Sequence, residues 1–408
     1  MRVLVFEPSH RGHVFTLLRH LLPALREVTD HVTAAVPEHA FTTDEFRVQL
    51  SHLTDKVAFD TCVPTAISEP FDLHRVVDCL LDTIARLKPE YLYVPRADGL
   101  AQILGMRRAT GRRTLPTDIP TEGLMFRGAF AYPQLTLAAR LKAFASFQSV
   151  KLGTWSTLHY LDPLVYDAIQ RRGGRFAARC RLMPEYVESS PIHDRTQARR
   201  FLGIPEDGRY IGFGGGVDRG KGAHLLLRAF ANAQRAPHDR LLFAGRLSPE
   251  IQSLVKADYA SLVQQNRLII LDRYLPDEEL FASMAAVDVV CTPYIRHVGS
   301  ASFVIRAAAA ERFVLAANYG WMGAIVPQFA LGRTCNVENP DEFANQITAS
   351  LDASEGYRRT DAGDRFVRFH SVENFQAAWT VQIRRQVGIV SSTTFLPWEW
   401  VTHEEPRH

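Results

Sequence analysis

The stretch FGGGVDRGKGAH, Phe213–His224, is where the architecture of this chain is easiest to read. It follows the strand-like run RYIGFG, Arg209–Gly214, and precedes the apolar positions of a helix. Glycine allows a backbone to approach an anion closely, and the N-terminus of a helix favours negative charge. Arg219 and Lys221 add two cations beside the turn. The stretch therefore predicts a phosphate-holding turn or, alternatively, a plain glycine-rich turn with solvated cations.

Strand-length apolar runs recur after this turn, with helical patterns between several of them. They are RLLFAG (Arg240–Gly245), RLIIL (Arg267–Leu271), VDVVCT (Val287–Thr292) and FVLAA (Phe313–Ala317). Short, nearly continuous apolar runs are typical of strands that are buried on both faces. Strands that alternate with helices predict right-handed crossovers and a parallel, doubly wound sheet. The first half repeats this α/β rhythm less regularly, in RVLVFE, HVTAAVP and EYLYVP.

Length and composition limit the class of protein. The 408 residues exceed the roughly 250–300 at which single cores stop growing, so we expect two domains. The net charge of +3 does not indicate a polyanion binder. Five scattered cysteines, with no CxxC pair, indicate reduced thiols rather than disulfides or zinc. Neither a signal-peptide core nor an apolar run of about 18 residues is present, so we expect a cytoplasmic protein.

Two common phosphate motifs do not fit the glycine turn. No Ser or Thr follows Lys221, so a Walker A motif and Mg²⁺-dependent nucleotide hydrolysis are poorly supported. Arg246 stands after the next strand, where a dinucleotide-binding fold would carry an acidic residue. A hydride-transfer enzyme is therefore disfavoured.

From the glycine turn onward the chain resembles the C-terminal domain of nucleotide-sugar glycosyltransferases with the GT-B fold. The resemblance is closest to the retaining glycosyl transferases group 1, which are family 4-like. The motifs that carry it, in order, are FGGGVDRGKGAHLLLRAF, RLLFAGR, YLPDEELFASMAAVDVVCTPY and GSASFVIRAAAAERFVLAANYGWMGAIV. FHSVENFQAAWTVQI, Phe369–Ile383, is similar to the terminal helix of that family.

The resemblance implies an α/β fold with two Rossmann-like, doubly wound domains that face each other across a cleft. The expected parts are an acceptor-binding domain at 1–187, a nucleotide-sugar domain at 195–370, a helix at 371–388 that returns to the first domain, and an irregular tail at 389–408. Trp398 and Trp400 indicate that this tail packs on another part of the chain.

The resemblance also implies the donor site, with a nucleotide-diphosphate sugar as substrate and no bound cofactor or metal. Lys221 matches the family's lysine that holds the diphosphate, while Gly216 stands at its usual arginine position, so Arg219 would substitute. Further candidate donor contacts are Gly215, Gly216, Arg246, Arg273, Leu275, His297, Gly299, Ser300 and Ser302. Alternatively, His297 merely closes its loop. The two serines suit phosphate oxygens, or alternatively plain helix capping.

One departure concerns the two glutamates that many retaining members place eight residues apart. Their aligned positions are Val298 and Arg306. The choice between retention and inversion therefore stays open. Arg306 is either a donor ligand or, as we prefer, a salt-bridged helix residue.

The first half offers scattered polar residues at strand ends, where open α/β sheets bind ligands. EPSHRGHVF, Glu7–Phe15, contains His10 and His13, either of which could accept a proton from an acceptor hydroxyl or simply bond to backbone. Asp98 in VPRADG is either a general base or the N-cap of the next helix. Glu122 is placed on a loop at the cleft.

Two arginine-rich stretches, 106–113 and 171–181, flank the amphipathic segment 134–151. We expect the arginines to be solvated, and the segment to bury Leu135, Ala138, Leu141 and Phe144 in the core. Together they could instead bring the first domain to an anionic membrane surface that holds a lipid-linked acceptor. Aromatic residues do not interleave with the arginines, so no nucleic-acid partner is expected.

The sequence thus predicts a glycosyltransferase that moves a sugar to a glycan, lipid-linked or small-molecule hydroxyl. Two alternatives use the same architecture: a sugar-nucleotide epimerase, and a non-catalytic protein that binds nucleotide or glycan. Phosphorylase chemistry lacks support, because no cofactor lysine motif is present.

Overall fold

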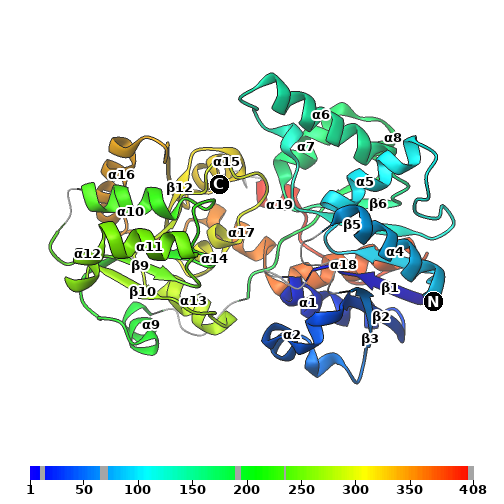
Figure 1. Ribbon diagram of the computed structural model, residues 1–408, viewed down its shortest axis with the longest axis horizontal. Coiled ribbons are helices and arrows are strands. Elements are labelled where there is room, and N and C mark those ends of the chain that lie inside the picture. The colour runs from blue at the N-terminus through cyan, green and yellow to red at the C-terminus, as the bar shows by residue number, and fades with distance from the viewer. Residues whose placement is uncertain (10–13, 65–71, 189–193, 234–235, 403–408) are drawn as a thin grey trace, which may run out of the picture. The chain divides into compact units, whose positions relative to one another are not determined.

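The computed structural model describes residues 1–9, 14–64, 72–188, 194–233 and 236–402, which form two compact units (Figure 1). Unit 1 comprises Met1–Tyr186 and Val372–Leu396, and unit 2 comprises Val187–Ser371 and the chain from Pro397. The sequence predicted boundaries at 187 and 195, a helix at 371–388 and a tail from 389. The chain therefore leaves unit 1, completes most of unit 2, returns, and ends in unit 2.

Unit 1 is built on a parallel sheet in the order β3-β2-β1-β4-β5-β6-β7. The strands are β1 Arg2–Phe6, β2 His31–Pro37, β3 Ala58–Val63, β4 Tyr91–Val94, β5 Thr121–Met125, β6 Thr157–Tyr160 and β7 Cys180–Leu182. The four residues of β4 are buried, as are those of β6 and all five of β5, as expected of strands covered on both faces. β1 is an interior strand, between β2 and β4.

Helices cover the sheet of unit 1 in two layers. They are α1 Val14–Arg26, α2 Asp44–Gln49, α4 Leu73–Leu87, α5 Asp98–Ala109, α6 Leu137–Leu152, α7 Pro163–Arg172, α8 Gly174–Ala177 and α18 Val372–Gln386, with short 3₁₀ turns at Glu38–Thr42, Ser51–Leu53 and Ala129–Ala131. α1 packs against α18, while α4 packs against α5 and α5 against α6 (Figure 1). Right-handed crossovers put the first pair and the second set on opposite faces.

The returning helix α18 is held in unit 1 by an apolar anchor. Trp379 is fully buried, and its ring lies 4.7 Å from the ring of Tyr93 and 4.6 Å from that of His159. Phe375 packs edge-on against Tyr186 at 5.2 Å. These contacts place α18 in the same hydrophobic core as β1 and α1.

Unit 2 contains a second parallel sheet, in the order β10-β9-β8-β11-β12-β13. The strands are β8 Arg209–Gly214, β9 Asp239–Ala244, β10 Leu268–Leu271, β11 Val289–Thr292, β12 Phe313–Ala317 and β13 Gly332–Cys335. Of these, all but β13 coincide closely with the apolar runs. β13, with the sequence GRTC, lies at the sheet edge and carries no such run, so the sequence did not reveal it.

The helices of unit 2 are α9 Arg195–Leu202, α10 Ala223–Asn232, α11 Pro249–Asp258, α12 Ala260–Gln264, α13 Asp277–Ala285, α14 Ser302–Ala309, α15 Gly320–Gln328, α16 Pro340–Ala353, α17 Asp361–Phe369 and α19 Trp398–Thr402. Several of them begin after a residue whose side chain caps them, among them α9, α11, α16 and α17. α13 follows Pro276 and carries Asp277, Glu278 and Glu279 in its first turn, where the helix dipole favours them.

Part of the tail is helical rather than irregular throughout. In α19 the side chain of Val401 is buried, and the ring of Trp398 lies 5.1 Å from Phe369 and 5.7 Å from Phe329. The Arg368 guanidinium lies 5.2 Å from the ring of Trp400. The tail therefore docks on unit 2 through its two tryptophans.

The expectation that α6 buries its apolar positions in the core is wrong. Leu135 is 71% exposed, and Leu141 and Phe144 are each 60% exposed. The helix instead buries Ala143, Phe147 and Val150. Packing against α5 thus covers the face of Ala143, Phe147 and Val150 and leaves the predicted face exposed.

Candidate functional site

Each sheet has one point where the strand order reverses. Most of the predicted site residues follow the carboxyl ends of strands, at the edge of each sheet where these points lie. In unit 1 the reversal lies between β1 and β4, and in unit 2 between β8 and β11. Crossovers on the two sides of such a point diverge onto opposite faces, which leaves an opening at the carboxyl ends of the strands. Ligands of open α/β sheets bind there.

The glycine turn of unit 2 lies at the end of β8, at this reversal. It is held to the neighbouring strand end by backbone bonds, since Gly215 N donates to Ala244 O at 2.9 Å and Val217 N to Arg246 O at 2.9 Å. Gly222, at the start of α10, has φ +80°, and a Cβ there would lie 2.0 Å from Pro293 O at the end of β11. Only glycine allows the start of α10 to approach the end of β11 this closely.

Lys221 is the cation of the turn. Its ammonium nitrogen lies 3.6 Å and 3.7 Å from the points that a Cβ of Gly215 and of Gly216 would occupy, and 5.9 Å from the Tyr294 ring. Burial lowers the pKa of Lys221, while the nearby Asp218 acts in the opposite direction. None of the ion pairs formed by the described residues involves Lys221. Lys221 is therefore a half-buried cation without a carboxylate partner, facing open glycine backbone.

Arg219 makes a different contact from the one expected of a second diphosphate ligand. Its Nη1 lies 3.0 Å from Glu250 Oε1 on α11, and both side chains are more than half exposed. The guanidinium is thus engaged by a surface carboxylate.

The loops after β9 and β10 carry further residues expected to contact the donor, Arg246, Arg273 and Leu275. The exposed Arg246 lies 5.9 Å from the ring of Tyr274, which is itself 38% exposed. Arg273 forms an ion pair with Glu279. Leu275 is only 6% exposed and belongs to the hydrophobic core of unit 2, so its side chain serves packing.

The start of α14 faces the same edge and lacks a side-chain cap. Its N-cap residue is Ala301, so neither Ser300 nor Ser302 performs the plain capping that was one prediction for them. Gly299 has φ +106°, and His297 Nε2 lies 3.1 Å from Ser300 O. The loop before α14 is therefore closed by its own imidazole, while the first N–H groups of the helix keep no side-chain acceptor from the N-cap.

Arg306 is buried in α14 and is not the salt-bridged residue that we expected. Its side chain is only 2% exposed, and Nε and Nη1 have no hydrogen-bond partner in the structure. No described carboxylate lies within ion-pair distance of it. Val298, the other position of the missing glutamates, is half-buried in the loop before the helix.

The corresponding edge of unit 1 holds a buried carboxyl, Glu7, directly after β1. Glu7 is fully buried, and Ser9 N donates to its Oε1 at 2.9 Å, while Oε2 has no partner. Burial raises the pKa of Glu7 to about 8, although Arg96 at the end of β4 lowers it in part. His10 and His13 lie outside the described residues.

Asp98 braces two strand ends and does not cap its own helix. Its Oδ1 accepts from Arg127 N at 2.8 Å and from Phe126 N at 3.1 Å, beyond the end of β5. The N-cap of α5 is Ala97, so the capping prediction is wrong. Burial raises the pKa of Asp98, and the two backbone bonds act against that rise.

Glu122 is not on a loop, contrary to the prediction. It lies within β5 and is fully buried, with its Oε2 2.8 Å from Nε2 of the equally buried His159. Gln382 of α18 donates to the other oxygen, Oε1, at 3.3 Å. The pair therefore helps to hold α18 in unit 1.

Sequence reasoning missed two aromatic residues that shape the edge of unit 2. Tyr294 lies beneath Lys221, and a Cβ at Gly215 would lie 2.9 Å from the Phe303 ring. Their positions in the sequence could have revealed them, since Tyr294 comes shortly after the end of a strand and Phe303 shortly after a glycine-containing loop.

The described residues contain neither a membrane-spanning helix nor a metal-binding cluster. No helix among them is long and apolar enough to cross a membrane. In the same part of the chain, no three His, Cys, Asp or Glu side chains gather as a metal site.

Comparison with known proteins points to one group of enzymes. Residues 208–353 match the family model described as "Glycosyl transferases group 1". The chain is 26% identical over 216 residues to a D-inositol 3-phosphate glycosyltransferase of Corynebacterium kroppenstedtii, a match that covers 49% of this chain and 47% of that protein. The chain thus spans about half the length of this relative.

Solved structures resemble the chain over nearly its whole length. Sucrose-phosphate synthase from Thermosynechococcus elongatus has a TM-score of 0.70 and 15% identity, covering 95% of this chain and 99% of that one. HepE of Anabaena, in complex with UDP, has a TM-score of 0.62 and 17% identity, covering 95% and 100%. At these identities the likeness shows the fold.

Proposed function

Because residues 208–353 belong to the glycosyl transferases group 1 and the chain has the GT-B fold, we propose that this protein transfers a sugar from a nucleoside diphosphate donor to an acceptor hydroxyl. The relative of 26% identity is named a glycosyltransferase, and one structural neighbour was solved with UDP. The activity, donor and acceptor of this chain are part of the proposal.

The observation that carries the proposal is Lys221 on the glycine turn. A half-buried ammonium group that has no carboxylate partner is stabilised when an anionic ligand binds beside it. The turn exposes backbone at Gly215 and Gly216, and Lys221 stands over both positions. A diphosphate would find there a cation, backbone donors and the uncapped start of α14.

The chemistry that these groups support is departure of a nucleoside diphosphate. As the bond between the sugar and the diphosphate breaks, negative charge develops on the leaving phosphate oxygen. Lys221 and the fixed backbone dipoles stabilise that charge without reorganising. Arg219 can contribute only if its guanidinium leaves the ion pair with Glu250 and binds the diphosphate instead. Neutralisation by these groups is the role that we assign to them, with no bound cofactor.

The acceptor would bind at the β1–β4 edge of unit 1. Glu7 and Asp98 lie there, and His10 and His13 belong to the same stretch of sequence. A glycan, a lipid-linked or a small-molecule hydroxyl remains the acceptor class. Peripheral contact with the cytoplasmic face of a membrane belongs to the same proposal, because a lipid-linked acceptor would be met there.

The donor assignment is tested by calorimetric titration of UDP, GDP, ADP, CMP and dTDP. We expect one nucleotide to bind wild type, and Lys221→Ala to weaken it by about tenfold to a hundredfold, the range for a hydrogen bond to a charged group. Lys256→Ala, which removes an exposed lysine of α11, is the matched control. Equal affinity in wild type and Lys221→Ala would contradict the assignment of the turn.

A second measurement separates transfer from its alternatives. The sugar nucleotide of the base that binds is incubated with the enzyme, with and without candidate acceptors. Acceptor-dependent release of the diphosphate supports transfer. Interconversion of the free sugar nucleotide would identify an epimerase, and tight binding without turnover of any donor would identify a binding protein.

A further inference from the structure

The helix α6 exposes an apolar stripe that nothing in the described part of the chain covers. Leu137, Leu141 and Phe144 recur at helical spacing, and they are 71%, 60% and 60% exposed. Leu135, just before the helix, and Leu152, at its end, extend the stripe and are 71% and 49% exposed. Exposed apolar residues that gather on one element mark an interaction surface, whereas scattered ones need no explanation.

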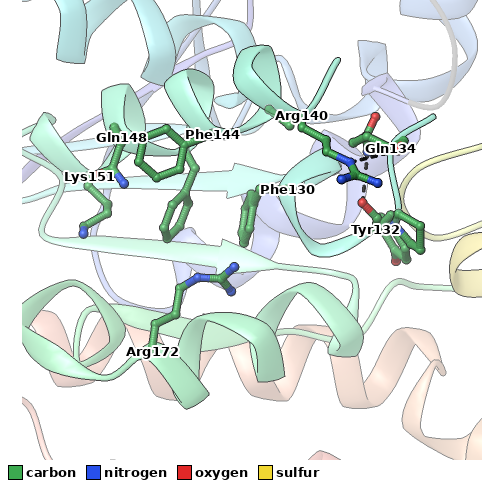
Figure 2. Close-up of a pocket in the computed structure, with 11 residues that line it drawn as sticks. Phe130, Tyr132, Gln134, Arg140, Phe144, Gln148, Lys151 and Arg172 are labelled. Carbon is green, nitrogen blue, oxygen red and sulfur yellow. Dashed lines mark hydrogen bonds between the residues drawn. The ribbon is translucent and has the colours of Figure 1, made fainter. Parts of the chain in front are cut away.

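A cavity of about 570 Å³ opens beside this stripe. Figure 2 shows the aromatic side chains of Phe130 and Phe144 within it, with Lys151 at one end, Arg140 at the other, and Arg172 of α7 pointing toward Phe130. The Arg172 guanidinium lies 5.4 Å from the ring of Phe130, and the Lys151 ammonium lies 5.6 Å from the ring of Phe147. The cavity thus combines apolar walls with cations at its margin.

Three cations beside α6 have no carboxylate partner among the residues that the structure describes. No acidic residue occurs between Glu122 and Asp162, and none of the ion pairs of the described residues involves Arg140, Lys151 or Arg172. Their charge is therefore available to an external anion.

The other arginine-rich stretch of unit 1 behaves differently. Arg107 pairs with Asp78 and Arg113 with Asp82, both at 2.5 Å, on the neighbouring helix α4. Two of the four arginines of that stretch are thus neutralised within the protein. Arg140 and Lys151, which form no ion pair with a described residue, line the same cavity as Phe144 of the exposed apolar stripe.

We propose that the α6 face docks on an anionic lipid surface. The stripe of Leu137, Leu141 and Phe144 enters the boundary between headgroups and acyl chains, and Arg140, Lys151 and Arg172 contact lipid phosphates beside it. Both features are those of helices that lie in a membrane interface. The link to a lipid-linked acceptor rests on the proposed function, whereas the docking itself depends only on this face.

Co-sedimentation of the full chain with lipid vesicles tests the proposal. We expect wild type to bind vesicles of phosphatidylcholine mixed with phosphatidylglycerol, and to bind those of phosphatidylcholine alone far more weakly. Leu141→Glu/Phe144→Glu should lower the partition onto vesicles by at least about tenfold, because two apolar side chains that would enter the membrane become anionic. Arg140→Gln/Lys151→Gln should lose about fivefold per cation.

A matched control is available on other helices. Val48→Glu/Phe201→Glu introduces the same charges at side chains that are 48% and 47% exposed, and it should sediment as wild type does. Circular dichroism checks that each variant is folded. Wild type that ignores phosphatidylglycerol, an α6 variant that binds as the control does, or a wild-type dimer that the α6 variant dissociates would each overturn the docking.

Titration of UDP into the same preparations keeps the two proposals apart. An α6 variant that binds UDP normally but no longer sediments supports docking. Wild type that binds UDP and ignores vesicles overturns docking and leaves the donor site in place. Wild type that sediments but binds none of the five nucleotides overturns the donor site alone.

Discussion

At the scale of single residues, the buried carboxyl of Glu7 makes the stability of unit 1 depend on pH. Its pKa is raised to about 8 in the folded chain, chiefly by burial, from an ordinary value of 4.5. Between these values the folded state binds the proton and the unfolded state does not, so the free energy of unfolding falls as pH rises. The slope is about 1.4 kcal/mol per pH unit at most.

Glu7→Gln should remove this slope, because the amide keeps the shape of the protonated acid. We expect the free energy of unfolding of the variant, relative to that of wild type, to rise progressively from pH 5 to pH 8. Urea denaturation followed by circular dichroism measures this difference. Glu90→Gln is the control: a hydrogen bond from Arg2 N lowers the pKa of this exposed carboxyl from its ordinary value of 4.5, so Glu90 should add little slope between pH 5 and pH 8. A wild-type profile parallel to that of Glu7→Gln would show that the carboxyl is ionised when folded.

Gly222 allows a second test at this scale. Gly222→Ala should destabilise unit 2 and weaken nucleotide binding, because the new methyl would meet Pro293 O and displace the turn that holds Lys221. Gly111→Ala is the control, since Gly111 also has positive φ, +67°, but open space around it. The control should cost roughly 1–2 kcal/mol of left-handed strain, and Gly222→Ala more. Equal losses of stability in the two variants would mean that the start of α10 can move away from the end of β11.

At the scale of elements, the docking of α18 depends on Trp379. Trp379→Ala should reduce the free energy of unfolding of unit 1 by about 3–5 kcal/mol, the usual cost of truncating a buried tryptophan. Unit 2 has its own hydrophobic core, so nucleotide binding should persist at temperatures where unit 1 has lost structure. Trp400→Ala, at a partly exposed position, is the control. Loss of nucleotide binding together with unit 1 would show that the two cores unfold as one.

The elements of unit 2 could largely be predicted from sequence, for a physical reason. β8, β9 and β12 are buried on both faces, which demands the continuous apolar runs that the sequence displays. The edge strand β13 is half-covered and carries Gly332, Arg333 and Thr334, so no such run forms. In unit 1, β5 contains Glu122, whose partner His159 lies on β6 and cannot be found from spacing.

The positions of site residues that follow from consecutive strand, turn and helix could be predicted from sequence. The ion-pair partners of those residues could not. Lys221 lies on the glycine turn because strand, turn and helix are consecutive in sequence. Arg219 finds Glu250, and Arg273 finds Glu279, through the fold of neighbouring loops. Similarly, Arg306 was expected to have a salt bridge, and only the packing of α14 reveals a buried guanidinium without one.

At the scale of the whole molecule, the two sheets confirm the predicted α/β architecture of two doubly wound units. The resemblance of residues 208–353 to the glycosyl transferases group 1 is likewise confirmed by the family model, while the solved structures that cover 95% of the chain show the fold. The roles of His10, His13 and Asp98, and those assigned to the donor contacts, stay predictions.

The return of α18 to unit 1 has a consequence for how the protein is made. A ribosome releases Met1–Tyr186 first, but the segment that completes this unit, Val372–Leu396, emerges only after the whole of Val187–Ser371. Until then the surfaces of Tyr93 and His159 that Trp379 covers face water or a chaperone. The amino-terminal unit therefore finishes folding only after most of the carboxyl-terminal one, Val187–Ser371, has been translated.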